Sequence, residues 1–384
     1  MAVTFLTGFE SAAALVDDIT LVGTAAYSTT QARTGTRSIR CNPASGVAGY
    51  ITTPTITTSS YLHFGLYVAS LPSVDRRIFG TASSTYLNLR LTSTGAIAVY
   101  SGASTLLGTS STAFSSPGWH WVGVRMASGT SVVYLQIDGV DEVTGTIGTV
   151  AAANTLGVLG TEASAIDIYI DDVIVDDAGF LAPSNVALLL PISDKSRDTQ
   201  WTGGSGGTTN LYDAVNNTPP VGSATESDTT QIEHAGGAIA VYQSNLTTYT
   251  TAGVGASDTV IALQGLIVWG EDSATGTKLL SYYGVSNPAW TGESDIDVST
   301  GHGSGAVGTY ATGTDYWNER RSAIVTSPSV TLGTSPVMSV WRNETASRVA
   351  SVCFMGMYVA WTPYVAPPVS MVVPRRVYPQ LIPH

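Results

Sequence analysis

The chain has 384 residues, which is enough for two domains of ordinary size. Only 11% of the residues are charged, while 43% are hydrophobic, so a sizeable core can form and a disordered chain is excluded. The net charge is −12, and the only lysines are Lys195 and Lys278, which excludes the basic face that a nucleic-acid backbone binder needs. The acidity favours solubility, with binding of a cation or a basic partner as the alternative.

Two cysteines, Cys41 and Cys353, are too few for a disulfide framework. Cys353 lies in an apolar run and is expected to be a buried free thiol. The N-terminus lacks a signal-peptide pattern, and no run of about 18 apolar residues is present. We therefore expect a protein that is made in a cytoplasm, does not insert into membranes and is released by lysis.

Strand-like segments recur about every ten residues along the chain, separated by turn residues. In the first half they span residues 61–68, 86–91, 96–100, 119–126, 131–137 and 166–175. In the second half they span residues 238–242, 260–269, 278–283, 321–325, 337–341 and 349–361. A segment at 184–190, ended by Pro191, fits a short helix or a buried strand equally well. Many short strands without helices predict an all-β protein of two antiparallel β-sandwich (jelly-roll) domains.

The first domain is expected at residues 1–180, and a linker at 180–184 separates it from a second domain at 184–362. Residues 363–384 hold six prolines, which prevent helix and discourage sheet pairing. This extended arm also carries Arg375, Arg376 and the apolar Tyr378. It is either a frayed tail or an assembly arm that packs on a neighbouring subunit.

The strand Trp119–Arg125 precedes a strand that ends in the turn Asp138-Gly139, where glycine supplies a positive φ angle. This pattern resembles the concanavalin A-like, laminin-G-type jelly roll over residues 1–180. That sandwich serves lectins, adhesion modules, glycanases and structural proteins alike, so the resemblance implies the fold and not a function. Tryptophans of this pattern are usually core residues, which is what we expect of Trp119 and Trp121.

Three pieces of the first half resemble jelly rolls of the carbohydrate-binding-module type: Gly8-Phe9-Glu10, the segment 32–39 and the segment 168–175. The resemblance implies a structural Ca²⁺ held by Glu10 and by either Asp171 or Asp172, with carbonyls near residues 34–37 completing the shell. Adjacent strand residues face opposite sides, so only one of the two aspartates is expected to face the ion. The alternative is an acidic strand that resists sheet aggregation, with no cofactor.

The second half carries a Leu-Pro at 190–191, a Trp-Thr at 201–202 and the run Tyr212-Asp213-Ala214-Val215 before Pro219-Pro220. This order resembles a domain of tailed-bacteriophage virion proteins over residues 184–362, although the Asp-Pro-x-Thr-Gly that often precedes the final Trp-Thr is missing here. The resemblance implies a virion structural protein of the tail tip, the baseplate or the head decoration. Its partners would then be other virion proteins and further copies of itself.

Catalytic patterns are incomplete. A concanavalin A-like glycanase needs paired carboxylates, commonly Glu-x-Asp-x-x-Glu, and Glu293-Ser294-Asp295 is followed by Val298 where the second glutamate belongs. The five histidines are not spaced as zinc ligands, and no nucleophile elbow or phosphate-binding loop is present. We expect no enzyme, and a glycan hydrolase is the least favoured alternative.

Glycan binding by a host-surface adhesin is the main alternative to a structural role. Aromatic side chains that stack on sugar rings are expected in or near loops of the second half. The candidates are Trp201, Trp290, Tyr316 and Trp317.

Overall fold

The structure is a computed structural model. It describes residues 3–365 except 13, 15–16, 81–85, 115–116, 161, 198–200, 204–208, 216–231, 236–239, 272–278, 285–315, 322–323, 329, 331–332, 334 and 343–348. The expected assembly arm therefore lies almost wholly outside the described residues, and so does Trp290.

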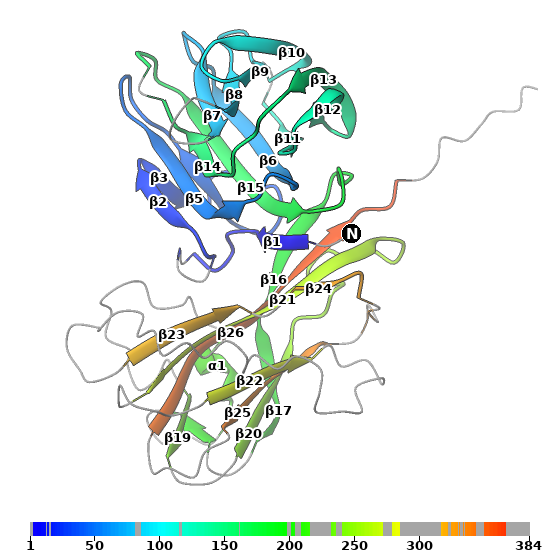
Figure 1. Ribbon diagram of the computed structural model, residues 1–384. Coiled ribbons are helices and arrows are strands. Elements are labelled where there is room, and N and C mark those ends of the chain that lie inside the picture. Colours follow the sequence, from blue (N-terminus) through cyan, green and yellow to red (C-terminus); the bar gives the residue numbers. More distant parts are fainter. Residues whose placement is uncertain are drawn as a thin grey trace, which may run out of the picture.

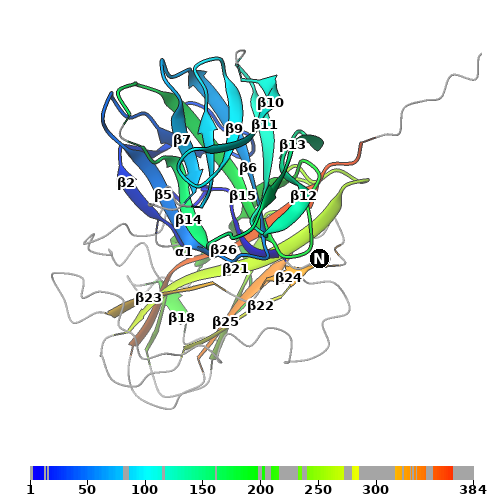
Figure 2. The same cartoon turned by 45° about the horizontal axis from the view of Figure 1, so that its top comes forward.

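The described chain is nearly all β, as the sequence predicts: four antiparallel sheets and one short helix, α1 (Tyr212–Val215). Sheets A and B take their strands from residues 3–176, and sheets C and D from residues 185–362. Figure 1 shows the two β-rich halves one above the other, and Figure 2 shows the same halves after a turn. The segment at 184–190, which the sequence left open, is strand β16.

Sheet A has the order β13 (Val140–Ile147), β12 (Gly129–Ile137), β11 (Trp119–Arg125), β6 (Tyr61–Ser70), β15 (Asp167–Asp176), β4 (Ser38–Cys41) and β3 (Ala25–Ser28), and β1 (Val3–Thr7) also pairs with β15. Sheet B has the order β10 (Thr105–Ala113), β9 (Ala96–Ser101), β8 (Leu87–Leu91), β7 (Arg76–Gly80), β14 (Ala153–Val158), β5 (Gly49–Ile56) and β2 (Thr20–Gly23).

Sheet C has the order β18 (Trp201–Gly203), β19 (Ile232–Ala235), β26 (Val349–Thr362), β21 (Thr259–Glu271) and β23 (Tyr316–Arg321); β16 (Asn185–Leu189) pairs with β26, and β24 (Val325–Thr326) pairs with β21. Sheet D has the order β17 (Pro191–Arg197), β20 (Ala240–Leu246), β25 (Val337–Arg342) and β22 (Leu279–Gly284).

Strand β6 shows why these segments form half-buried strands. Its residues Leu62, Phe64, Leu66 and Val68 alternate inward and belong to the core between sheets A and B. Its other face, with His63 and Tyr67, points outward. The turn after β12 also forms as the sequence predicts, with positive φ at both Asp138 (53°) and Gly139 (80°).

The expectation that both tryptophans are core residues is confirmed for Trp121, which belongs to a buried hydrophobic cluster, and is wrong for Trp119. The inward residues of β11 are Val122 and Val124, while Trp119 and Trp121 lie on the outer face of sheet A. Trp121 is buried there, but in the contact with the second half of the chain, and Trp119 is only half-buried. Strand alternation places the two tryptophans on one face, and the valines between them already fill the inner core.

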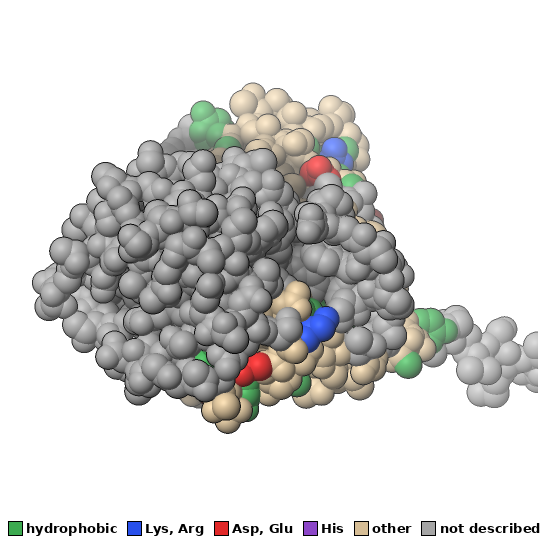
Figure 3. Space-filling view, turned by 90° about the horizontal axis from the view of Figure 1, so that it is seen from below, with side chains coloured by type: hydrophobic (Ala, Val, Ile, Leu, Met, Phe, Trp, Pro, Cys, Tyr) green, Lys and Arg blue, Asp and Glu red, His purple; other side chains and the backbone are tan. Residues whose placement is uncertain are grey.

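A second core lies inside the half that holds sheets C and D, and a third one lies between the two halves. The third core joins residues such as Leu6 and Ile174 to Val186, Phe354 and Tyr358. Figure 3 views the molecule from below, where few of the described side chains are charged, in keeping with the composition.

Candidate functional site

The richest cluster of buried polar side chains lies where the chain passes from β15 to β16. There the loop at residues 30–37 packs across the outer face of sheet A and meets the linker at Ser184 to Val186. Glycine at position 8 lets β1 approach this linker, because a Cβ there would lie 2.8 Å from the carbonyl oxygen of Val186. We call this cluster the joint.

Both Asp171 and Asp172 are fully buried and both reach the same loop. Asp172 has a left-handed backbone (φ 50°), and the pairing of β15 with β6 shifts register between Asp171 and Ile174. The expectation that only one aspartate could face the site is therefore wrong. A β-bulge breaks strict alternation and turns two consecutive side chains to one side.

Asp172 connects the two halves of the chain. One carboxylate oxygen forms an ion pair with Nη1 of Arg33 at 2.5 Å. The other accepts hydrogen bonds from the Thr34 hydroxyl and, at 2.8 Å, from the backbone N–H of Val186. The Thr34 hydroxyl also lies 2.8 Å from the carbonyl oxygen of Val186.

Asp171 binds the backbone of the loop at residues 30–37. Its Oδ2 accepts from the backbone N–H of Arg33 at 2.7 Å, and its Oδ1 accepts from the N–H of Asp172 at 2.8 Å. Backbone N–H groups donate to a carboxylate more strongly than to a neutral acceptor, so this arrangement fixes the loop.

Arg33 is the cation of the joint. Its guanidinium also donates to the carbonyl oxygen of Ser184 and lies 4.8 Å from the ring centre of Trp121. Glycine at position 65 makes room for it, since a Cβ there would lie 2.6 Å from Cδ of Arg33. The sequence offered no signal for Arg33, because its partners lie about 140 residues away in the chain.

Glu10 lies on the far end of the same loop. Its carboxylate accepts from the backbone N–H groups of Thr36 and Arg37 (both 2.9 Å) and from the Thr36 hydroxyl (2.9 Å). Gly35 is left-handed (φ 62°), and any Cβ there would collide with this carboxylate. Glu10 therefore closes the loop as a hydrogen-bond acceptor.

Burial dominates the electrostatics of the joint. It raises the pKa of Asp171 well above its usual value, and the neighbouring Asp172 raises it further. Burial also raises the pKa of Asp172, against the opposing effect of Arg33 and Thr34. The pKa of Glu10 is raised by burial too, despite the N–H donors of Arg37 and Thr36.

These residues do not fit the calcium ion that the sequence resemblance implies. The oxygens of Asp172 are taken by a guanidinium, a hydroxyl and an N–H group, and the oxygens of Glu10 by the donors of Thr36 and Arg37. No group of three or more His, Cys, Asp or Glu side chains in the described part of the chain is arranged to hold a metal. The guanidinium of Arg33 lies beside Asp172, where the sequence resemblance implies a calcium ion.

A second set of contacts holds the linker at Leu181. Its N–H donates to Nε2 of His63 at 3.0 Å, and its carbonyl oxygen accepts from the indole N–H of Trp121 at 3.3 Å. The His63 ring stacks on Trp121 with 5.9 Å between ring centres, and Phe180 meets it edge-on. Burial lowers the pKa of His63 to about 3, so this histidine is neutral at physiological pH.

Contacts from the last long strand complete the joint. The hydroxyl of Tyr358 in β26 donates to Asp17, which also accepts from the Tyr27 hydroxyl at 2.6 Å. Farther along, the hydroxyls of Ser184 and Thr362 lie 2.9 Å apart. Strand β26 thus contacts the first half of the chain through both apolar and polar side chains.

The described part of the structure does not bring together the residues that the sequence predicts for glycan binding. Trp201 lies in β18 opposite His234, and Tyr316 and Trp317 lie in β23 opposite Glu271 and Gly270. The side chains of these three residues lie outside the described part of the structure. The same holds for the whole of Trp290 and of the arm residues Arg375, Arg376 and Tyr378. Those predictions stay predictions.

No protein-family model and no curated protein matches the sequence. Solved structures that match include domain 4 of AbnA, an extracellular GH43 arabinanase of Geobacillus stearothermophilus in complex with arabinotriose, at 19% identity and a TM-score of 0.35, covering 45% of this chain and 91% of that chain. Another is the N-terminal CBM22-1-CBM22-2 tandem domain of Xyn10C from Paenibacillus barcinonensis, at 9% identity and a TM-score of 0.26, covering 93% and 97%.

At such TM-scores these likenesses carry no statement about ligand or activity. The virion resemblance of the second half rests on its sequence motifs alone. Among the described residues, no helix has the length and apolar character to cross a membrane.

Proposed function

We propose that this chain is a non-enzymatic structural protein that holds two β-sandwiches in a fixed relative orientation, and that it works in the virion of a tailed phage. The observation that carries the proposal is the joint. Asp172 is fully buried and binds Arg33 of one half and the backbone of Val186 at the start of the other.

The energetics of the joint favour a rigid connection. A hinge motion between the halves would separate Arg33 from Ser184 and Asp172 from the N–H group of Val186, which removes hydrogen-bond partners from charged side chains shielded from water and is unfavourable. It would also expose the apolar core between the halves. Such a connection suits a building block whose surfaces must keep their positions in an assembly.

The same arrangement argues against chemistry at the joint. A general acid or base must reach its substrate, but Asp171 and Asp172 are fully buried and their oxygens accept hydrogen bonds from the loop and the linker. This supports a role without catalysis for the acidic pair. Virion partners, copies of the same chain and an assembly role for the arm follow from the sequence resemblance.

Purified phage particles test this function. An antibody against the chain should detect it in washed particles at a constant ratio to the major capsid protein, and a chain truncated after residue 365 should incorporate poorly. Finding the full chain only free in the lysate would contradict the virion assignment. Normal incorporation of the truncated chain would contradict the arm.

Glycan binding is the second candidate, and a specific surface favours it. Trp119, Tyr67 and Tyr169 are paired across three strands on the outer face of sheet A, with ring centres 5.6 and 5.9 Å apart. Arg40 and Asp167 continue this row with a two-pronged ion pair (3.0 and 2.7 Å). The rings of Trp119 and Tyr67 are half-buried, while Tyr169 is buried. Half-buried rings beside fixed polar groups are what sugar rings bind.

A glycan array decides this candidate. The intact chain should bind a defined glycan, and Trp119→Ala should abolish the signal without changing the melting temperature. Tyr364→Ala, which removes an exposed aromatic side chain outside sheets A and B, is the matched control and should bind normally. Equal binding by the intact chain and Trp119→Ala would reject the row as the site.

A further inference from the structure

The outer face of sheet B carries two opposed arginines. Arg77 in β7 and Arg90 in β8 are direct partners in the strand register, and both are partly exposed. Side chains directly opposite each other on one face of a sheet lie close together, and like charges in that position destabilise the pairing. A neighbouring carboxylate or a bound anion could offset this repulsion.

No carboxylate neutralises this pair among the described residues. The ion pairs found there involve Arg33, Arg40, Arg76 and His120, but neither Arg77 nor Arg90. The nearest acid along β7, Asp75, instead accepts from the N–H of Ser93 at 3.4 Å. The segment 81–85 that follows β7 contains no acidic residue. Two unneutralised cations side by side are unexpected in a chain of net charge −12.

The two arginines differ in how they are held. The guanidinium of Arg90 donates to Asn88 Oδ1 at 3.2 Å and to the carbonyl oxygen of Ala103 at 2.6 Å, and it lies 4.1 Å from the ring centre of Tyr100. The Nε of Arg77 is enclosed and meets no acceptor among the described residues. One cation is thus fixed in place by the chain. The enclosed Nε of the other is out of reach of a ligand, so a bound anion would have to meet the terminal nitrogens of this partly exposed guanidinium.

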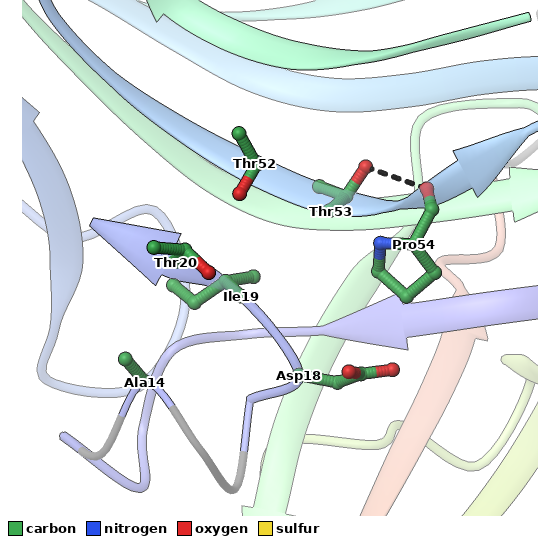
Figure 4. A pocket seen from close by; sticks show the side chains of 7 residues that line it. All are labelled: Ala14, Asp18, Ile19, Thr20, Thr52, Thr53 and Pro54. Carbon is green, nitrogen blue, oxygen red and sulfur yellow. Dashed lines mark hydrogen bonds between the residues drawn. The ribbon is translucent and has the colours of Figure 1, made fainter. Parts of the chain in front are cut away.

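The same face continues as a row of hydroxyl groups. Thr155, Thr52 and Thr20 are partners across β14, β5 and β2. The Thr155 hydroxyl is buried and donates to the carbonyl oxygen of Gly80, so Thr52 and Thr20 are the members of the row that a ligand can reach. The row ends in a hollow of about 380 Å³ that Thr20, Thr52 and Asp18 help to line. Figure 4 shows Thr20 and Thr52 next to each other at this hollow, with Pro54 beyond them. Hydroxyls and one carboxylate suit a ligand rich in hydroxyl groups.

We propose that the outer face of sheet B binds an acidic sugar chain, whose carboxylate lies between Arg77 and Arg90 and whose hydroxyls meet the threonine row. Charge complementarity selects the carboxylate, because a planar guanidinium binds it with two parallel hydrogen bonds. The threonines select a hydroxylated carrier over an acidic peptide. This site goes beyond the structural role and does not depend on a virion context.

The test uses the purified full chain and oligogalacturonate of defined length, measured by titration calorimetry at low salt. The fully methyl-esterified oligomer has the same sugars without the charge, and inorganic phosphate is the second comparison. We expect the acidic oligomer to bind and both comparisons to fail. Arg77→Gln should weaken binding at least about tenfold, since it removes a charged hydrogen-bond donor. Arg125→Gln, at the end of β11 in sheet A, should bind like the parent chain.

Melting temperatures separate binding from folding. Arg77→Gln should melt at or slightly above the parent temperature, because it relieves a repulsion, and the oligomer should raise the melting temperature of the parent only. Arg77→Lys keeps the charge without the planar fork and should bind with intermediate affinity. The proposal is overturned by equal binding of the esterified oligomer, by binding of phosphate alone, by no binding at all, or by unchanged binding in Arg77→Gln.

Discussion

Two surfaces of the first half of the chain treat their arginines in opposite ways. On the outer face of sheet A, Arg33 is covered by the linker and neutralised by Asp172. On the outer face of sheet B, Arg77 and Arg90 oppose each other without an acid among the described residues. A charge shielded from water needs a partner of opposite charge within the chain, whereas an exposed charge can bind a partner from outside the chain. The first surface therefore connects the two halves of the chain, and we propose that the second binds a ligand.

Removing the acid of the joint should have the largest effect. Asp172→Ala leaves the Arg33 side chain, which is only 14% exposed, without its carboxylate, and we expect the free energy of unfolding to fall by about 3–5 kcal/mol. Denaturant unfolding measures it. Asp167→Ala, which removes the acid of a half-exposed pair with Arg40, is the control and should cost about 1 kcal/mol or less. Similar losses in the two variants would refute the distinction.

Acid should weaken the joint through His63. Burial holds its folded pKa at about 3, below the usual 6.5, so the unfolded chain binds a proton that the folded chain does not. This contribution is complete above pH 6.5 and is lost as the pH falls toward 3, by about 1.4 kcal/mol per pH unit. Comparing the parent with His63→Gln, which keeps an acceptor for Leu181, isolates it from the aspartates, whose raised pKa values act in the opposite direction. Parallel pH profiles would contradict the assignment.

Gly65→Ala should be costly chiefly because of Arg33. The added Cβ would lie 2.6 Å from Cδ of Arg33, and moving that side chain disturbs its ion pair. We expect a loss of about 1–3 kcal/mol, measured by thermal unfolding. Gly118→Ala, where a Cβ meets nothing within 4 Å, should change little. A harmless Gly65→Ala would show that Arg33 is free to move.

Calcium should have the smallest effect. Because Glu10 and Asp172 already accept from N–H, O–H and guanidinium groups, an excess of Ca²⁺ over a chelator should leave the melting temperature unchanged. A rise with Ca²⁺, and not with Mg²⁺, would restore the calcium site that the sequence resemblance implies.

The sequence was a good guide to what repeats locally. The alternation in residues 61–68 predicted β6, and Asp138-Gly139 predicted its turn, because both depend on neighbours in the chain. It was a poor guide to the joint. The bulge at Asp171–Asp172 and the space that Gly65 leaves for Arg33 arise only when distant segments meet. The sequence placed Glu10, Asp171 and Asp172 near one loop, and the structure shows their oxygens accepting hydrogen bonds from that loop.

The central claim is that the joint holds the two halves as one rigid body, and a distance between them tests it most directly. Spin labels at Val74→Cys and Ile192→Cys, both exposed positions in different halves, can be placed in a chain carrying Cys353→Ser. The account predicts one narrow distance distribution that broadens in Asp172→Ala. A broad distribution in the chain with an intact joint would contradict it.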